Sequence, residues 1–130
     1  MWGRASIITG LLGLLLLAGC GGDNEEPMTK AAFIKEVDAI CRSAVKDLQA
    51  EVDDGKKLSV GVEKSLRAEI DGIEALNPPE DAAAKTDEIL DLAQQAVALI
   101  GKGDTIEAGA RIAKAERIAR DYGIEACLVF

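Results

Sequence analysis

Hydrophobic residues follow two different patterns along this chain. Near the amino terminus they form one run, from Ile7 to Ala18. From residue 29 onward they recur at steps of three and four, the spacing that places apolar side chains on one face of an α-helix. The alternation typical of strands does not reach five positions, and the tail over 127–130 is too short to count. The pattern predicts an all-α domain behind a separate leader.

The periodic part divides into four expected helices, each ended by glycine, proline or acidic residues. The expected helices run from about Thr29 to Val52, from near Ser59 to Leu76, from Glu80 to Ile100 and from Asp104 to Tyr122. Short loops between them predict an antiparallel up-down bundle. Because Gly61 and Gly72 weaken the second helix, a bundle of three helices with a frayed second segment is the alternative.

The helical spacing also predicts which side chains form the core. The first helix is expected to bury Phe33, Val37, Ile40, Cys41, Ala44, Leu48 and Val52. The fourth is expected to bury Ile106, Ala110, Ile112 or Ala113, Ala115, Ile118, Ala119 and Tyr122.

The leader, residues 1–19, has the features of a lipoprotein signal peptide. Arg4 supplies a positive charge, and the apolar run that follows is shorter than the ~20 residues that a membrane-spanning helix needs. The run ends at Leu17-Ala18-Gly19-Cys20, which resembles the lipobox of bacterial lipoproteins. We expect Leu17, Ala18 and Gly19 to be recognised by the signal peptidase, and Cys20 to become a diacylglyceryl cysteine at the new amino terminus.

Charge and composition place the rest of the chain outside the membrane. Residues 20–28 are short, acidic and Gly-rich, which predicts a lipidated flexible tether before a helical domain over 29–130. The chain carries 15 basic and 23 acidic side chains, a net charge of −8 that disfavours nucleic-acid binding. Two acyl chains suffice for stable membrane attachment. The expected location is the extracytoplasmic face of the cell membrane, held there by lipid.

Cys41 and Cys127 remain once Cys20 carries lipid. Paired cysteines in exported domains are usually bridged, and an antiparallel bundle lets the chain after Gly123 run back to the first helix. A disulfide is therefore the main interpretation. A redox pair or a metal site is the alternative, but the chain has no C-x-x-C sequence and no histidine.

Three sequence features together resemble a family. They are F-x4-D-x2-C over 33–41, the Leu76-Asn77-Pro78-Pro79 sequence, and A-x2-YG-x3-C over 119–127. This combination, behind a lipobox, resembles a group of small actinobacterial lipoproteins. Val37 departs from the pattern, which has a small residue there. The resemblance implies a disulfide-stapled helical domain and implies no activity.

The missing chemistry argues against an enzyme. Without histidine, the Ser-His-Asp and Cys-His systems and the Glu-x-x-His di-iron motif are excluded. No cofactor and no metal site is expected. We therefore expect a non-catalytic protein-interaction module that binds an envelope protein partner. The alternative is a carrier or sensor for a small apolar ligand, with a pocket between helices near Phe33, Tyr122 and Phe130. An exposed apolar patch favours the first function, and an apolar cavity favours the second.

Overall fold

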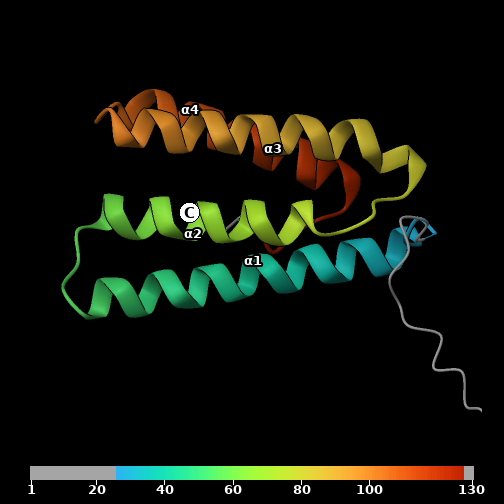
Figure 1. Ribbon diagram of the computed structural model, residues 1–130, viewed down its shortest axis with the longest axis horizontal. Coiled ribbons are helices and arrows are strands. Elements are labelled where there is room, and N and C mark those ends of the chain that lie inside the picture. Colours follow the sequence, from blue (N-terminus) through green and yellow to red (C-terminus); the bar gives the residue numbers. More distant parts are fainter. Residues whose placement is uncertain (1–25, 128–130) are drawn as a thin grey trace, which may run out of the picture.

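The computed structural model describes residues 26–127, which form an all-α bundle with no strand in this range. Its helices are α1 (Lys30–Asp53), α2 (Leu58–Glu74), α3 (Glu80–Gly101) and α4 (Thr105–Tyr122). In Figure 1 successive helices run in opposite directions, as the short loops predict. The predicted signal peptide over residues 1–19, the predicted lipid-attachment residue Cys20 and the predicted pocket residue Phe130 lie outside the described residues.

The helix ends follow the capping residues in the sequence. The Thr29 side chain accepts a hydrogen bond from the Ala32 backbone N–H at 3.2 Å, and that of Asp104 accepts one from the Glu107 N–H at 3.1 Å. Gly123 ends α4 in the left-handed conformation, with φ 105°. Local signals of this kind explain why the predicted boundaries lie within a few residues of the observed ones.

Helix α2 is continuous, so the alternative with three helices is wrong. Its two interior glycines have a packing role instead. A Cβ at Gly72 would lie 3.0 Å from Ile40 Cγ2, and a Cβ at Gly61 would lie 2.8 Å from Leu48 Cδ1. The glycines therefore let α2 approach α1 closely, and this contact offsets their low helix propensity.

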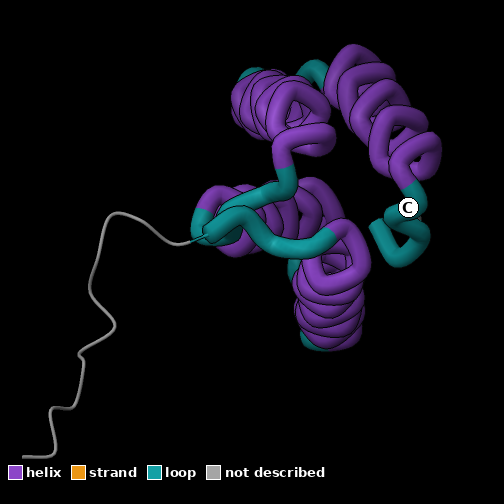
Figure 2. The backbone as a smooth tube through the Cα atoms, turned by 90° about the vertical axis from the view of Figure 1, so that its right-hand side faces the viewer, coloured by secondary structure: helices purple, strands orange, loops and turns teal. Residues whose placement is uncertain are grey.

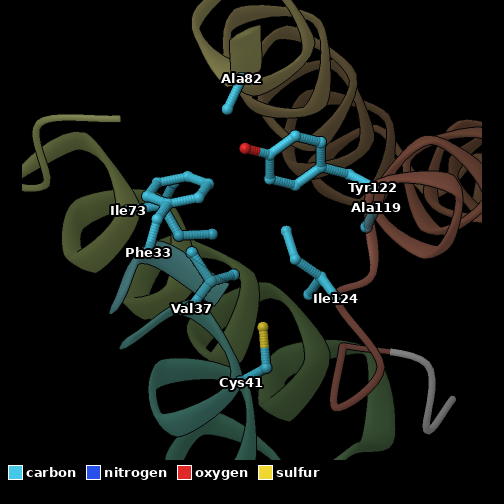
Figure 3. Close-up of a cluster of buried hydrophobic side chains, with 8 residues drawn as sticks. All are labelled: Phe33, Val37, Cys41, Ile73, Ala82, Ala119, Tyr122 and Ile124. Carbon is cyan, nitrogen blue, oxygen red and sulfur yellow. The ribbon is translucent and has the colours of Figure 1, made fainter. Parts of the chain in front are cut away.

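The helices form two antiparallel hairpins, α1–α2 and α3–α4, which lie one above the other (Figure 1, Figure 2). One buried cluster joins all four helices of the described region and the C-terminal segment around Phe33, Cys41 and Tyr122 (Figure 3). A second cluster, around Leu66 and Ala96, joins α2, α3 and α4. Small alanines in both clusters bring the helices close, while few large side chains fill the space between them.

The predicted core face of α4 is partly wrong. The residues of α4 that are buried are Ala108, Ala115, Ala119 and Tyr122. Ile106, by contrast, is 85% exposed, and Ala110 and Ala113 are exposed with it. At 100° per residue these three lie opposite the buried set. The expected stripe therefore combined two opposite faces of one helix, because alanines occur on both. At the end of α1, Val52 is also exposed.

The segment after α4 returns to α1, where it is held at three places. Cys127 lies at disulfide distance from Cys41, with their Cα atoms 5.0 Å apart. The Asp38 carboxylate accepts hydrogen bonds from the backbone N–H groups of Glu125 and Ala126 at 3.1 and 2.9 Å. Ile124, in the same segment, is buried. Figure 2 shows this segment descending from the α3–α4 hairpin to the α1–α2 hairpin.

The bundle begins slightly earlier than expected. Met28, which the sequence places in the tether, packs against the core, and its backbone N–H donates to the Asn77 carbonyl at 2.9 Å. The chain before α1 therefore enters the bundle, at Met28, at the end that holds the α2–α3 loop. The α1–α2 and α3–α4 turns lie at the opposite end (Figure 1).

Candidate functional site

A cavity of about 60 Å³ lies between the helices of the bundle. All four helices of the described region contribute to its walls, and so does the C-terminal segment. The apolar lining includes Phe33 and Val37 from α1, Leu66, Ile70 and Ile73 from α2, Ile89 and Ala93 from α3, Ala115 and Ala119 from α4, and Ile124. Since a cavity holds one water per roughly 10–15 Å³ on this measure, there is room for about four to six waters.

Two acidic side chains also line this cavity, Glu69 from α2 and Glu116 from α4. Glu69 is only 9% exposed, which is unusual for a carboxyl group. Its Oε1 atom is buried without a hydrogen-bond partner among the described residues, and so is Oε1 of Glu116. An unpartnered buried oxygen of this kind costs free energy, and a bound group that donates a hydrogen bond would remove the cost.

The surroundings of the two carboxyl groups disfavour negative charge. Burial, followed by the charge of Glu116, raises the pKa of Glu69 from 4.5 to about 7. Burial also raises the pKa of Glu116, although the nearby Arg120 opposes the shift. The charge on Glu69 therefore changes near neutral pH, in a wall that is otherwise mostly apolar.

Thr86 is the remaining polar side chain that lines the cavity. Its hydroxyl donates to the Ala82 carbonyl of its own helix at 2.9 Å. The hydroxyl proton of Thr86 is thus already in a hydrogen bond. Among the described lining residues, the side chains that have an oxygen without a hydrogen-bond partner are the two carboxyl groups. The cavity can accept hydrogen bonds and can neutralise a positive charge.

The predicted pocket residues have different positions. Phe33 lines the cavity. Tyr122 does not line it but packs edge-on against Phe33, with ring centroids 6.2 Å apart (Figure 3). The Tyr122 hydroxyl donates to Asp81 Oδ1 at 3.0 Å. Phe130 is outside the described residues. Tyr122 therefore packs against Phe33 on the side away from the cavity and does not contact a ligand in the cavity.

The sequence analysis missed Glu69 and Glu116, although the pattern contains a signal for both. Glu69 lies three residues after Leu66 and four before Ile73, and Glu116 lies four after Ile112. Each is therefore a charged residue at a core position of a helical stripe. Such a residue marks either the edge of the core or a polar group inside it, and only the packing distinguishes the two.

The end of the bundle opposite Met28 and the α2–α3 loop carries exposed apolar side chains. Leu58 and Val60 are 63% and 52% exposed near the α1–α2 turn, and Ile106 is exposed near the α3–α4 turn. Both turns lie at the left end of Figure 1. Exposed aliphatic residues gathered at one end are a candidate contact surface for a protein partner.

Comparison of the chain with protein families, with curated proteins and with solved structures finds no match. Within residues 26–127, no helix is long and apolar enough to cross a membrane, and no group of three or more His, Cys, Asp or Glu side chains could hold a metal ion. The candidate site therefore has to be interpreted from its own geometry and chemistry.

Proposed function

We propose that the protein is a non-catalytic binding protein of the cell envelope, which holds a small, mostly apolar ligand inside its helical bundle. The observation that carries this proposal is the cavity, together with the buried and unpartnered Glu69 in its wall. A polar group in an otherwise apolar pocket is the usual arrangement for orienting a small ligand. The cavity size restricts the ligand to about five non-hydrogen atoms.

The location is proposed on separate grounds. The sequence Leu17-Ala18-Gly19-Cys20 supports a lipid anchor at Cys20, and the paired Cys41 and Cys127 fit an oxidising compartment. The ligand would then be bound on the extracytoplasmic face of the membrane. The intact mass of the protein purified from membranes tests this part: residues 20–130 plus an acylglyceryl group support it, and an unmodified full-length chain contradicts it.

The ligand site is tested by NMR titration of the full-length protein in non-ionic detergent. The probe is n-butanol, which has five non-hydrogen atoms, and the signals followed are the methyl groups of Ile70 and Ile73. These signals should shift in a saturable way. Ala115→Val, which adds two methyl groups at the cavity wall, should weaken the binding. Ala110→Val, the same change on the exposed side of α4, should leave it unchanged. Absence of saturable shifts with n-butanol and with charged four-carbon probes alike would contradict the proposed function.

Protein interaction is the second candidate function, supported by the exposed Leu58, Val60 and Ile106. These side chains lie at the end farther from the tether, where a membrane-anchored protein presents its surface to an envelope partner. Photo-crosslinking in intact cells from a residue placed at position 58 tests it. A defined adduct, absent when the crosslinker is placed at the exposed position 91 of α3, supports the interaction.

A further inference from the structure

Although most of the cavity lining is apolar, its charged side chains all have the same sign. The charged side chains that face it come from α2 and α4, namely Glu69 and Glu116. From α1, α3 and the C-terminal segment, the described lining residues are uncharged. Arg120 acts on Glu116, and Arg111 is within 3.8 Å of Glu107, but neither arginine lines the cavity. An entering ligand therefore meets two acidic groups and no basic one.

This arrangement discriminates between ligand classes. An anion would be repelled by both carboxylates, and a purely apolar molecule would leave their buried oxygens without partners. Ca²⁺ and Mg²⁺ need six or more oxygen ligands, which two carboxyl groups in an apolar wall do not provide. An ammonium group on a short hydrocarbon satisfies both features, because its N–H groups donate to the carboxylates and its chain contacts the apolar wall.

We propose that the cavity is a binding site for a small organic cation, a primary alkylammonium ion of about five non-hydrogen atoms. Its ammonium group lies between Glu69 and Glu116, and its hydrocarbon part lies against Phe33 and Ile73. This inference rests on the proposed function and specifies the ligand class of the same cavity. Glu69 and Glu116 are then the residues that determine specificity, and the aliphatic residues provide the fit.

The test compares four-carbon ligands that differ in charge. The full-length protein in non-ionic detergent at pH 8 is titrated with n-butylammonium, n-butanol and butyrate, and the Ile70 and Ile73 methyl signals report binding. We expect n-butylammonium to bind at least ten-fold more tightly than n-butanol, and butyrate not to bind. Equal affinities for n-butylammonium and n-butanol would overturn the cation site and leave the proposed function intact. No binding of any probe would overturn both.

Variants assign the preference to the two carboxyl groups. Glu69→Gln should remove most of the ten-fold preference for n-butylammonium over n-butanol. Glu116→Gln should reduce the same preference. Glu74→Gln is the matched control, because Glu74 is exposed on the same helix and glutamine keeps an oxygen for its bond with Gln94. An unchanged preference in both Glu69→Gln and Glu116→Gln would overturn the proposal.

Discussion

Asp38 Oδ1 lies 2.9 Å from the backbone nitrogen of Ala126 and accepts its hydrogen bond. The same oxygen accepts the N–H of Glu125, so one side chain on α1 holds two donors of the C-terminal segment. Together with the Phe33–Tyr122 ring contact and the Cys41–Cys127 pair, this explains the two sequence motifs as one structural unit. The phenylalanine, aspartate and cysteine of the F-x4-D-x2-C motif on α1 each contact residues of the YG-x3-C motif at and after the end of α4.

Loss of the Asp38 carboxylate should therefore destabilise the bundle. Asp38→Ala leaves two backbone donors unpaired, and we expect a loss of about 1–3 kcal/mol in the free energy of unfolding. Asp38→Asn should retain most of the stability, because an amide oxygen can accept the same bonds. Urea denaturation measures both. Asp47→Ala, at an exposed site on the same helix, is the control. Equal losses in the variants at positions 38 and 47 would contradict the structural role.

The Cys41–Cys127 bridge should be the largest single stabilising link between α1 and the C-terminal segment. The chain-entropy model gives roughly 4–5 kcal/mol for a loop with a sequence separation of 86 residues. Cys41→Ala and Cys127→Ala should each lose about this amount, and the double variant should lose no more than either one. Thermal unfolding without reductant measures the three losses. Additive losses in the double variant would show that the two cysteines act independently.

Glu69 should make stability depend on pH. Its pKa is about 7 in the folded protein and 4.5 without the fold, so between these values the folded state binds more protons than the unfolded state. Stability from this group is therefore greatest at low pH and falls as pH rises from 4.5 to 7. Glu69→Gln removes the titration. From pH 4 to pH 8, the difference in free energy of unfolding between Glu69→Gln and the wild type should shift in favour of the variant by up to about 3 kcal/mol. A difference that is constant with pH would show that the Glu69 carboxyl is not perturbed by burial.

Replacing two of the glycines by alanine should affect the stability of the protein differently. A Cβ at Gly109 on α4 meets nothing within 4 Å, so Gly109→Ala should gain about 0.5–1 kcal/mol from helix propensity. A Cβ at Gly72 on α2 would lie 3.0–3.3 Å from three atoms of Ile40, so Gly72→Ala should not show this gain. Urea denaturation compares the two variants. A comparable gain at position 72 would show that α1 and α2 are not in close contact there.

The free space in the cavity should be detectable as a difference in stability between two variants. Ala115→Val places two methyl groups at the cavity wall, whereas Ala110→Val places them in solvent at the same propensity cost. We expect the position 115 variant to be the more stable of the two by about 1 kcal/mol, from apolar burial. Differential scanning calorimetry of the two variants measures the difference. If Ala115→Val were the less stable variant, there would be no free space at this wall.

The sequence predicts where the helices begin and end better than it predicts which face of each helix is buried. Thr29, Asp104 and Gly123 act within one turn of the chain, so the helix ends at these residues can be read locally. Which side of α4 is buried depends on the neighbouring helices, and alanines on both sides make Ile106 and Ala108 equally plausible core residues. For the same reason the stripe identifies Phe33 as a core residue but cannot show that a cavity remains beside it.

The carboxyl groups of the cavity illustrate a second limit. Glu69 breaks an otherwise apolar face of α2, and this position alone does not show whether its side chain turns outward to water. Its burial follows from the approach of α4, which brings Glu116 to the same cavity from a site 47 positions further along the chain. An electrostatic pair of this kind depends on tertiary packing, and no local pattern contains it.

The pH dependence of n-butylammonium binding tests the central claim most directly. The alkylammonium ion stays charged below about pH 10, as a lysine side chain does, so the change in charge expected at the site between pH 5 and 8 is that of Glu69, whose pKa burial raises to about 7. Protons compete with the cation for Glu69, so affinity should fall about ten-fold or more as pH is lowered from 8 to 5, with the change centred near 7. Affinity that is the same at pH 5 and pH 8 would contradict recognition of the ligand by the buried carboxylates.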